Sequence, residues 1–191
     1  PMTFWLAGAA WYSLFYYDYY MYTLDKDFLR ERALPFMEQA ALFYEDFLKE
    51  GNDGKYIFNP SYSPENNPAN SSSQACVNAT LCVMSANGLL RSVIEASQIV
   101  GVNQDKIPVW KAMQEKMPSY MLNENGEIRE WMWKDLQDNH KHRHASHLFG
   151  LYDFHDPLIM GNQDLIEGCK RAINRRMEIR RQDNGGIMAF G

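Results

Sequence analysis

The sequence has few of the residues that define several large protein classes. Among its 191 residues are three cysteines, Cys76, Cys82 and Cys169, and they form no C-x-x-C pair. An odd number of cysteines at these spacings indicates neither a disulfide framework nor a zinc knuckle, so we expect buried free thiols. Acidic residues outnumber basic ones and the net charge is −5, which argues against a nucleic-acid-binding protein with a basic face.

Basic residues are concentrated in one segment, KRAINRRMEIRR, at residues 170–181. Its arginines recur at spacings that line one side of a helix: Arg175, Arg176, Arg180 and Arg181. We expect these four side chains to form a solvated helix face. Phosphate binding is the alternative interpretation.

Charge is also missing from the start of the chain, because the first charged residue is Asp18. An uncharged run of this length is compatible with a signal peptide or a membrane segment. The run has no positively charged start and no A-x-A cleavage site, and it contains several tyrosines. We therefore expect a buried helix and no membrane association. Because Pro1 stands inside an apolar run without a methionine, we also expect the chain to be cut from a longer protein.

Helical periodicity runs through most of the sequence, and strand patterns are scarce. The expected helices are 5–22, 25–50 with an Asp25 cap and an end at Gly51, 75–100 before Gly101, a capped helix from 103 to about 118, and 162–181. Pro35 either kinks the second helix or starts a new segment. Long loops separate these helices. One of them, rich in Pro, Asn and Ser, is expected at residues 59–74, after a turn and a short strand at residues 52–58. A second turn is expected at Asn125-Gly126. The pattern predicts an all-α fold in a single domain, 1–191, built of helical hairpins with long functional loops.

Hairpins joined by long loops suit an α/α toroid, in which paired helices surround a central pocket. A complete ring needs about twelve helices of roughly 20 residues each, which is more than this chain provides. We therefore predict an incomplete array, a partial toroid.

All five histidines lie between residues 140 and 155: His140, His142, His144, His147 and His155. The H-x-H-x-H spacing puts alternate side chains on one face of an extended segment, as metal ligands require. However, no H-E-x-x-H motif is present and His144 and His147 have no acidic partner. His140 and His155 are expected to cap backbone groups or to lie at the surface.

A sugar pocket is the favoured interpretation of RHASHLFGLY, residues 143–152. Arg143 offers a rigid fork of donors beside imidazoles that donate or accept hydrogen bonds, as sugar hydroxyls require. Aromatic residues near it in sequence are candidates for the wall against the sugar ring: Trp131, Trp133, Phe149 and Tyr152.

A second candidate lies in the loop PSYSPENNP, residues 60–68. Pro60 and Pro64 stiffen this loop, and Glu65 is the only acidic residue from Gly54 to Gln74. A carboxyl group there acts as a general acid if its surroundings raise its pKa. By residue type alone, an exposed loop glutamate is the simpler interpretation.

Two motif blocks in this order, PSYSPEN and then EWMWKD followed by HRHASHLFGLY, resemble glycoside hydrolase family 95, whose members include α-L-fucosidases and related α-L-galactosidases. Residues 9–37 resemble the helix pair before the first motif, so the similarity covers nearly the whole chain. The resemblance implies an (α/α)6 barrel that hydrolyses terminal α-L-fucosyl linkages with inversion, with a glycan substrate and without metal or cofactor. It implies Glu65 as the general acid, Arg143 and His144 as sugar-holding residues, and Trp11 as a pocket residue. It also implies a periplasmic or secreted protein.

The sequence lacks counterparts of the residues that act in general-base catalysis in the family. The asparagines that orient the water and the aspartate that polarises them have no counterpart here, and we expect them before Pro1 and after Gly191. Asp135 and Asp183 are conceivable substitutes without support in the sequence. We therefore predict that the isolated chain is inactive, and that its sugar is fucose or a related deoxy- or L-sugar.

Two other hypotheses remain open. The chain is compatible with a non-catalytic carbohydrate-binding or scaffold remnant of the same fold. It is also compatible with a metal protein that uses His142, His144 and His147. The sequence does not indicate the oligomeric state.

Overall fold

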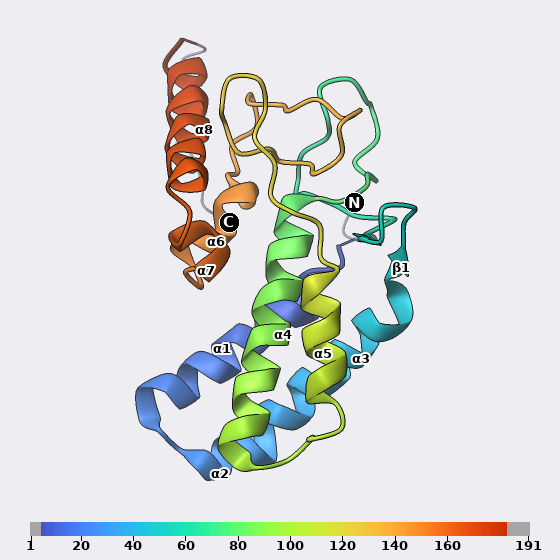
Figure 1. The fold of residues 1–191 in the computed structure, drawn as a ribbon. Coiled ribbons are helices and arrows are strands. Elements are labelled where there is room, and N and C mark those ends of the chain that lie inside the picture. Colours follow the sequence, from blue (N-terminus) through green and yellow to red (C-terminus); the bar gives the residue numbers. More distant parts are fainter. Residues whose placement is uncertain (1–4, 183–191) are drawn as a thin grey trace. The chain divides into compact units, whose positions relative to one another are not determined.

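A computed structural model describes residues 5–182, which are mostly helical, as predicted (Figure 1). The chain divides into two compact units. We call Leu6–Ile57 with Ser85–Met117 the hairpin unit, and Phe58–Met84 with the described residues from Pro118 onward the loop unit. The prediction of one domain over residues 1–191 stays a prediction.

The hairpin unit begins with α1, Gly8–Thr23, which packs against α3, Leu34–Phe47, as expected for a helical hairpin (Figure 1). A short helix α2, Lys26–Phe28, and a π-helical turn, Leu29–Ala33, lie between them. The predicted cap is confirmed, since the Asp25 carboxylate accepts hydrogen bonds from two backbone N–H groups of the following turn at 3.0 and 2.9 Å. The proline at position 35 lies in the first turn of α3, so it starts a new segment.

Helix α1 is buried on one side only, which corrects the expectation of a buried helix. Tyr17 and Tyr20 belong to the core, whereas Tyr12, Phe15 and Tyr22 are 62%, 52% and 91% exposed within the described chain. The two sets of side chains lie on opposite faces of the same helix, so its uniformly apolar sequence concealed an exposed face. Within residues 5–182, no helix is long and apolar enough to cross a membrane.

Helix α3 ends at Phe47, four residues before the predicted end at Gly51. The reason is that Lys49–Glu50, strand β1, pairs antiparallel with Tyr56–Ile57, strand β2, so the chain is already extended there. Helix α4, Thr80–Val100, ends before Gly101 as predicted, and the φ of +81° at this glycine explains the end. Helix α4 starts in the loop unit and continues into the hairpin unit.

Helix α5, Ile107–Glu115, completes the hairpin unit. Its residue Lys106 at the N-cap makes no side-chain capping bond, so the predicted cap is wrong. The helix is held instead by Trp110, which is buried and donates a hydrogen bond to Oε1 of Glu45 in α3 at 2.9 Å.

Besides the start of α4, the loop unit contains two long irregular segments and three complete helices. The helices are α6, Phe149–Tyr152, α7, Pro157–Met160, and α8, Gln163–Gln182; the first follows a 3-10 turn at Ser146–Leu148. Sequence patterns had indicated α8 but not the two short helices. The predicted turn at Asn125-Gly126 is present, and Gly126 has a φ of +71°.

The irregular segments of the loop unit surround a core of large aromatic and sulfur-containing side chains. All three cysteines are buried free thiols, as predicted. Burial raises the pKa of Cys76 and of Cys169 to about 12, so both remain protonated at neutral pH. Isolated β-bridges, such as the one that pairs Ala79 with Trp131, connect the two long segments through this core.

Candidate active site

Glu65 lies at the tip of a tightly held loop in the loop unit. Its neighbours Pro64 and Asn66 are buried, whereas the Glu65 side chain is 48% exposed. The carbonyl of Pro64 accepts a hydrogen bond from Oγ of Ser146 at 2.8 Å and lies 3.1 Å from Nδ1 of His144. The residue before the glutamate is therefore fixed directly by the histidine-rich segment.

The carboxylate of Glu65 forms an ion pair with the guanidinium of Arg143. The backbone N–H of Glu65 also donates to Nε2 of His142 at 3.2 Å. The structure thus brings together three residues that the sequence had marked, Glu65, Arg143 and His144, although they are about 80 positions apart along the chain. Their roles toward a substrate stay predictions.

The charges around Glu65 favour its ionised form. The hydrogen bond from Arg143 and its positive charge hold the pKa of Glu65 below its usual range, with smaller contributions from the neighbouring histidines. A general acid needs the opposite shift, because it must carry a proton at the working pH. In this arrangement Glu65 is a carboxylate at neutral pH.

His142 is neutral in the same arrangement. Burial, and then the neighbouring His144, Arg176 and Arg143, lower the pKa of His142 to about 4. A neutral imidazole has one ring nitrogen that accepts hydrogen bonds. This explains how Nε2 of His142 accepts the N–H of Glu65.

Trp11 belongs to α1 in the hairpin unit, where its side chain is partly buried. Its predicted place in a sugar pocket stays a prediction. The expected aromatic wall is corrected in part, because Trp131 and Phe149 are fully buried core residues. Trp133 and Tyr152 are partly exposed, so they remain candidates for a wall.

The described part of the chain contains no cluster of side chains that could bind a metal ion, as the metal hypothesis requires. No group of three or more His, Cys, Asp or Glu side chains within residues 5–182 is placed to hold a metal ion. His147 is fully buried, and burial lowers its pKa well below the usual value. The rings of His142 and His144 meet edge to face, with 4.9 Å between their centroids.

The remaining predicted residues are at ordinary structural positions. His155 is exposed, as expected, and His140 is partly buried with its Nε2 3.4 Å from a carboxylate oxygen of Glu127. Asp135 is exposed. Asp183 lies outside the described residues.

Sequence reasoning missed a buried ion pair between Glu130 and Arg176, whose side chains are 1% and 0% exposed. The prediction that Arg176 belongs to a solvated face of the last helix is wrong. Arg176 continues the buried stripe of α8 at Leu165, Cys169 and Ala172, at intervals of three or four residues. That spacing is the signal that could have placed this arginine in the interior.

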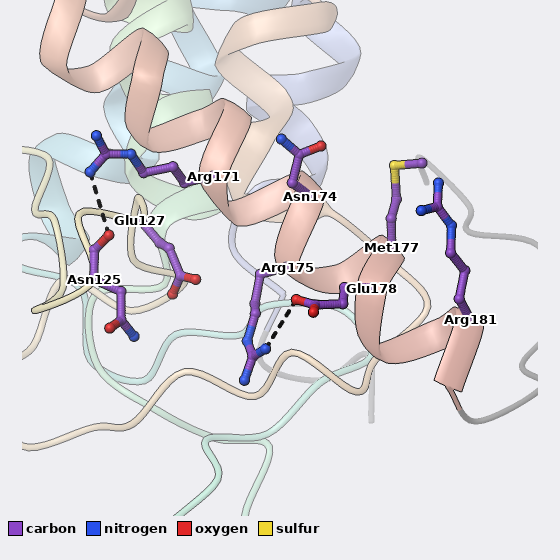
Figure 2. Close-up of a pocket in the computed structure, with 8 residues that line it drawn as sticks. All are labelled: Asn125, Glu127, Arg171, Asn174, Arg175, Met177, Glu178 and Arg181. Carbon is purple, nitrogen blue, oxygen red and sulfur yellow. Dashed lines mark hydrogen bonds and ion pairs between the residues drawn. The ribbon is translucent and has the colours of Figure 1, made fainter.

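The other arginines of α8 lie partly at an open pocket with a volume of about 540 Å³ (Figure 2). In this pocket Arg175 pairs with Glu178 at 3.2 Å, and Nη1 of Arg171 is 3.5 Å from the carbonyl of Asn125 (Figure 2). The lining consists of Asn125, Glu127, Arg171, Asn174, Arg175, Met177, Glu178 and Arg181. Because Glu65 and Arg143 are not among these residues, the pocket is separate from the candidate site.

Comparison with known proteins supports the resemblance found in the motifs. The sequence model of the glycosyl hydrolase family 95 catalytic domain matches residues 1–190. The chain is 32% identical over 180 residues to alpha-L-fucosidase 2 from Arabidopsis thaliana, an alignment that covers 91% of this chain and 21% of the relative. It is 27% identical over 154 residues to probable alpha-fucosidase A from Aspergillus niger, with coverage of 76% and 19%. The chain thus spans about a fifth of the length of the curated relatives that it matches.

Proposed function

Starting from the premise that this chain belongs to glycoside hydrolase family 95, we propose that it supplies the acid side of a glycosidase active site. The substrate is a glycan with a terminal α-L-fucosyl group or a related L-sugar, and the reaction inverts the anomeric centre. Glu65 is the general acid, Arg143 and His144 hold the sugar, and Trp11 contributes an aromatic surface. The general base is supplied by residues outside this chain.

One observation carries this proposal, namely the convergence of Glu65, Arg143 and His144 in the loop unit. A half-exposed carboxyl group on a fixed loop can reach a bound ligand, while its buried neighbours keep it in place. A guanidinium and an imidazole beside it provide the donors and acceptors that sugar hydroxyls need. A carboxyl group in this position can protonate the leaving oxygen once its pKa has risen.

The low pKa of Glu65 sets a condition on the mechanism. We propose that a sugar hydroxyl replaces Glu65 as the partner of Arg143 when the substrate binds. Loss of this partner and exclusion of water both raise the pKa of Glu65, which then takes up a proton. Glu65 donates this proton to the glycosidic oxygen as the C–O bond breaks, while a base removes a proton from the water that attacks the anomeric carbon.

The proposed architecture is a partial (α/α)6 toroid that the rest of the protein completes. The helical hairpin of α1 and α3 and the exposed aromatic face of α1, which includes Tyr12 and Phe15, support it, because such a face is suited to further helices. A crystal structure of the complete gene product tests the arrangement, and a single layer of helices without a central pocket would contradict it. A periplasmic or secreted location is also proposed, and cell fractionation with an antibody against the chain tests it.

The deciding experiment measures hydrolysis of α-L-fucosides by the complete protein. We expect Glu65→Gln to lower kcat by about 10²–10⁴-fold for an alkyl or sugar leaving group, which needs a proton. An activated aryl leaving group needs no proton, so kcat for an aryl fucoside should fall much less. Glu178→Gln on the exposed side of α8 is the matched control and should keep wild-type rates. Equal loss with both leaving groups would contradict the acid role of Glu65.

The isolated 191-residue chain should show no turnover, because its base is missing. Measurable hydrolysis of an aryl α-L-fucoside by this chain, lost on Glu65→Gln, would overturn that expectation.

A non-catalytic sugar-binding function is the second candidate, and the low pKa of Glu65 favours it. In that case Glu65 and Arg143 act as a pair of opposite charges that binds hydroxyl groups. The complete protein would then bind L-fucose, as measured by calorimetry, without hydrolysing any fucoside.

A further inference from the structure

We propose that Glu130 and Arg176 are positioning residues that fix the Glu65 loop against the histidine-rich segment. This inference rests on the proposed function of Glu65. Neither side chain can touch a substrate, since both are buried in the loop unit. Their role is to hold the proposed acid and its arginine partner face to face.

Glu130 anchors both sides of Glu65. Its Oε1 accepts a hydrogen bond from Oγ of Ser63 at 2.7 Å, and its Oε2 accepts one from Nδ2 of Asn66 at 2.8 Å. Ser63 precedes the proposed acid by two positions and Asn66 follows it directly. One buried carboxylate therefore fixes the two ends of the short segment that carries Glu65.

Arg176 anchors both sides of Arg143 in the same way. Its Nη1 donates to the carbonyls of His142 and His144 at 2.9 and 2.8 Å, and these residues flank Arg143 directly. Its Nη2 donates to Oε2 of Glu130. The ion pair thus joins two segments that are far apart in sequence, at the residues beside the two groups of the candidate site.

The charges of the pair are needed for this arrangement. Burial raises the pKa of Glu130 above the usual glutamate value, and the charge of Arg176 and the donors on Ser63 and Asn66 oppose this rise. A carboxylate with these donors keeps a defined orientation, because each oxygen has a fixed partner. An apolar pair of similar volume would fill the space without orienting either segment.

The test uses the complete protein with Glu130→Gln, with Arg176→Lys, and with the double replacement Glu130→Met and Arg176→Met. The apolar double variant keeps the test possible if the single variants fail to fold. Arg175→Met, one position away on the exposed side of α8, is the matched control. Each variant is first checked for folding by circular dichroism and by its unfolding temperature.

Two readouts separate positioning from general stability. The first is kcat of the folded variants, which we expect to fall about 100-fold with an alkyl leaving group and little with an activated aryl group. A loss of this size is typical when a reacting group is displaced by about 1 Å. KM should rise with both substrates, because Arg143 is also proposed to hold the sugar, and Arg176→Lys should recover part of the kcat that the double variant loses. Second, the pKa of Glu65, followed by ¹³C NMR, should rise toward the ordinary glutamate value because Arg143 no longer faces it.

The outcomes also separate this inference from the proposed function. If Glu65→Gln selectively impairs the alkyl substrate but the folded double variant keeps wild-type kinetics and an unchanged Glu65 pKa, the positioning role is wrong and the acid role stands. If Glu65→Gln has no selective effect, the acid role fails, and the positioning role fails with it. If Glu65→Gln and the folded double variant both lose kcat selectively with the alkyl substrate, and Arg175→Met does not, the acid role and the positioning role are both supported.

Discussion

Removing the positive partner of the buried ion pair should destabilise the protein far more than removing its exposed neighbour. Arg176→Met leaves the carboxylate of Glu130 buried with only the neutral donors on Ser63 and Asn66. Breaking a buried pair by deleting one partner costs about 3–5 kcal/mol of unfolding free energy, a large part of the about 5–15 kcal/mol typical of a domain. Arg175→Met removes an exposed i,i+3 pair with Glu178, which is worth about 0–1 kcal/mol.

The difference in unfolding free energy between Arg176→Met and Arg175→Met should depend on pH, because Glu130 titrates. Burial raises the pKa of this carboxyl, and Arg176→Met removes the charge that lowers it, so the folded pKa in the variant lies further above the unfolded value. The folded variant then binds a proton at a pH where the unfolded chain has none. Its stability therefore improves relative to wild type as the pH falls from 7 toward 5.

The assay is urea unfolding followed by tryptophan fluorescence at pH 7 and pH 5, with both arginine variants and the wild type side by side. We expect a gap of about 3 kcal/mol or more at pH 7 that shrinks at pH 5. Equal losses for Arg176→Met and Arg175→Met would refute the reasoning, as would a gap that widens at pH 5. Combining Arg176→Met with Glu130→Met should restore part of the stability, because it removes the unpaired charge but leaves Oγ of Ser63 and the carbonyls of His142 and His144 without these partners.

Three further substitutions or conditions test other parts of the structure. Asp25→Ala removes the two capping bonds before α2 and should cost about 1 kcal/mol in urea unfolding, whereas Asp25→Asn should cost less. Gly168→Ala places a Cβ 2.5 Å from Cδ2 of Leu122, but this side chain is 37% exposed and can move, so the unfolding temperature should fall only slightly, with a loss of about 1 kcal/mol or less. The pKa of His142 is lowered to about 4, so the folded state disfavours the protonated imidazole. The neutral His142 therefore contributes fully to stability above the unfolded pKa of about 6.5. This contribution decreases as the pH falls toward 4. Replacement of His142 by Gln should make urea midpoints between pH 6.5 and 4 less sensitive to pH, and an unchanged pH profile would contradict this.

The sequence predicted the helical class, most helix positions and the capping residue at Asp25, because these depend on local patterns. Helical periodicity, an N-cap residue and a glycine after the last turn act within a few residues of each other. The end of α3 was wrong because Lys49–Glu50 pairs with a strand that lies beyond a turn. That contact is not local, so the periodicity of the helix itself could not reveal it.

The candidate site was predictable in its parts and not in its electrostatics. The motifs indicated the isolated Glu65, which follows the stiffening prolines Pro60 and Pro64, and the Arg143-His144 pair. Their ion pair could not, because the charge on Glu65 depends on which of its neighbours faces it. The prediction for the buried Arg176 was wrong because an arginine within a basic run usually faces solvent, although its spacing from Cys169 and Ala172 continues the apolar stripe.

The composition of the Glu65 loop, rich in Asn and Ser, is also typical of disordered segments, and the structure explains why it is ordered here. Its backbone groups need partners, and amide side chains supply them across the two long segments. Nδ2 of Asn139 donates to Oδ1 of Asn66 at 3.0 Å and to the carbonyl of Asn67 at 3.1 Å. Asn70 accepts from the N–H of Gln137 at 3.0 Å.

These neutral bonds and the buried ion pair have different consequences. Each amide bond contributes about 1 kcal/mol and can be exchanged for a bond to water when it lies near the surface, so the loss of one leaves the others intact. Water cannot replace the bonds of Glu130 and Arg176, because both groups are buried. The asparagines therefore explain why the two segments adhere, whereas the ion pair determines which residues of the two segments face each other. A search for comparable sites should accordingly look for a charged residue within the apolar stripe of the helix behind the loops, as Arg176 lies in α8.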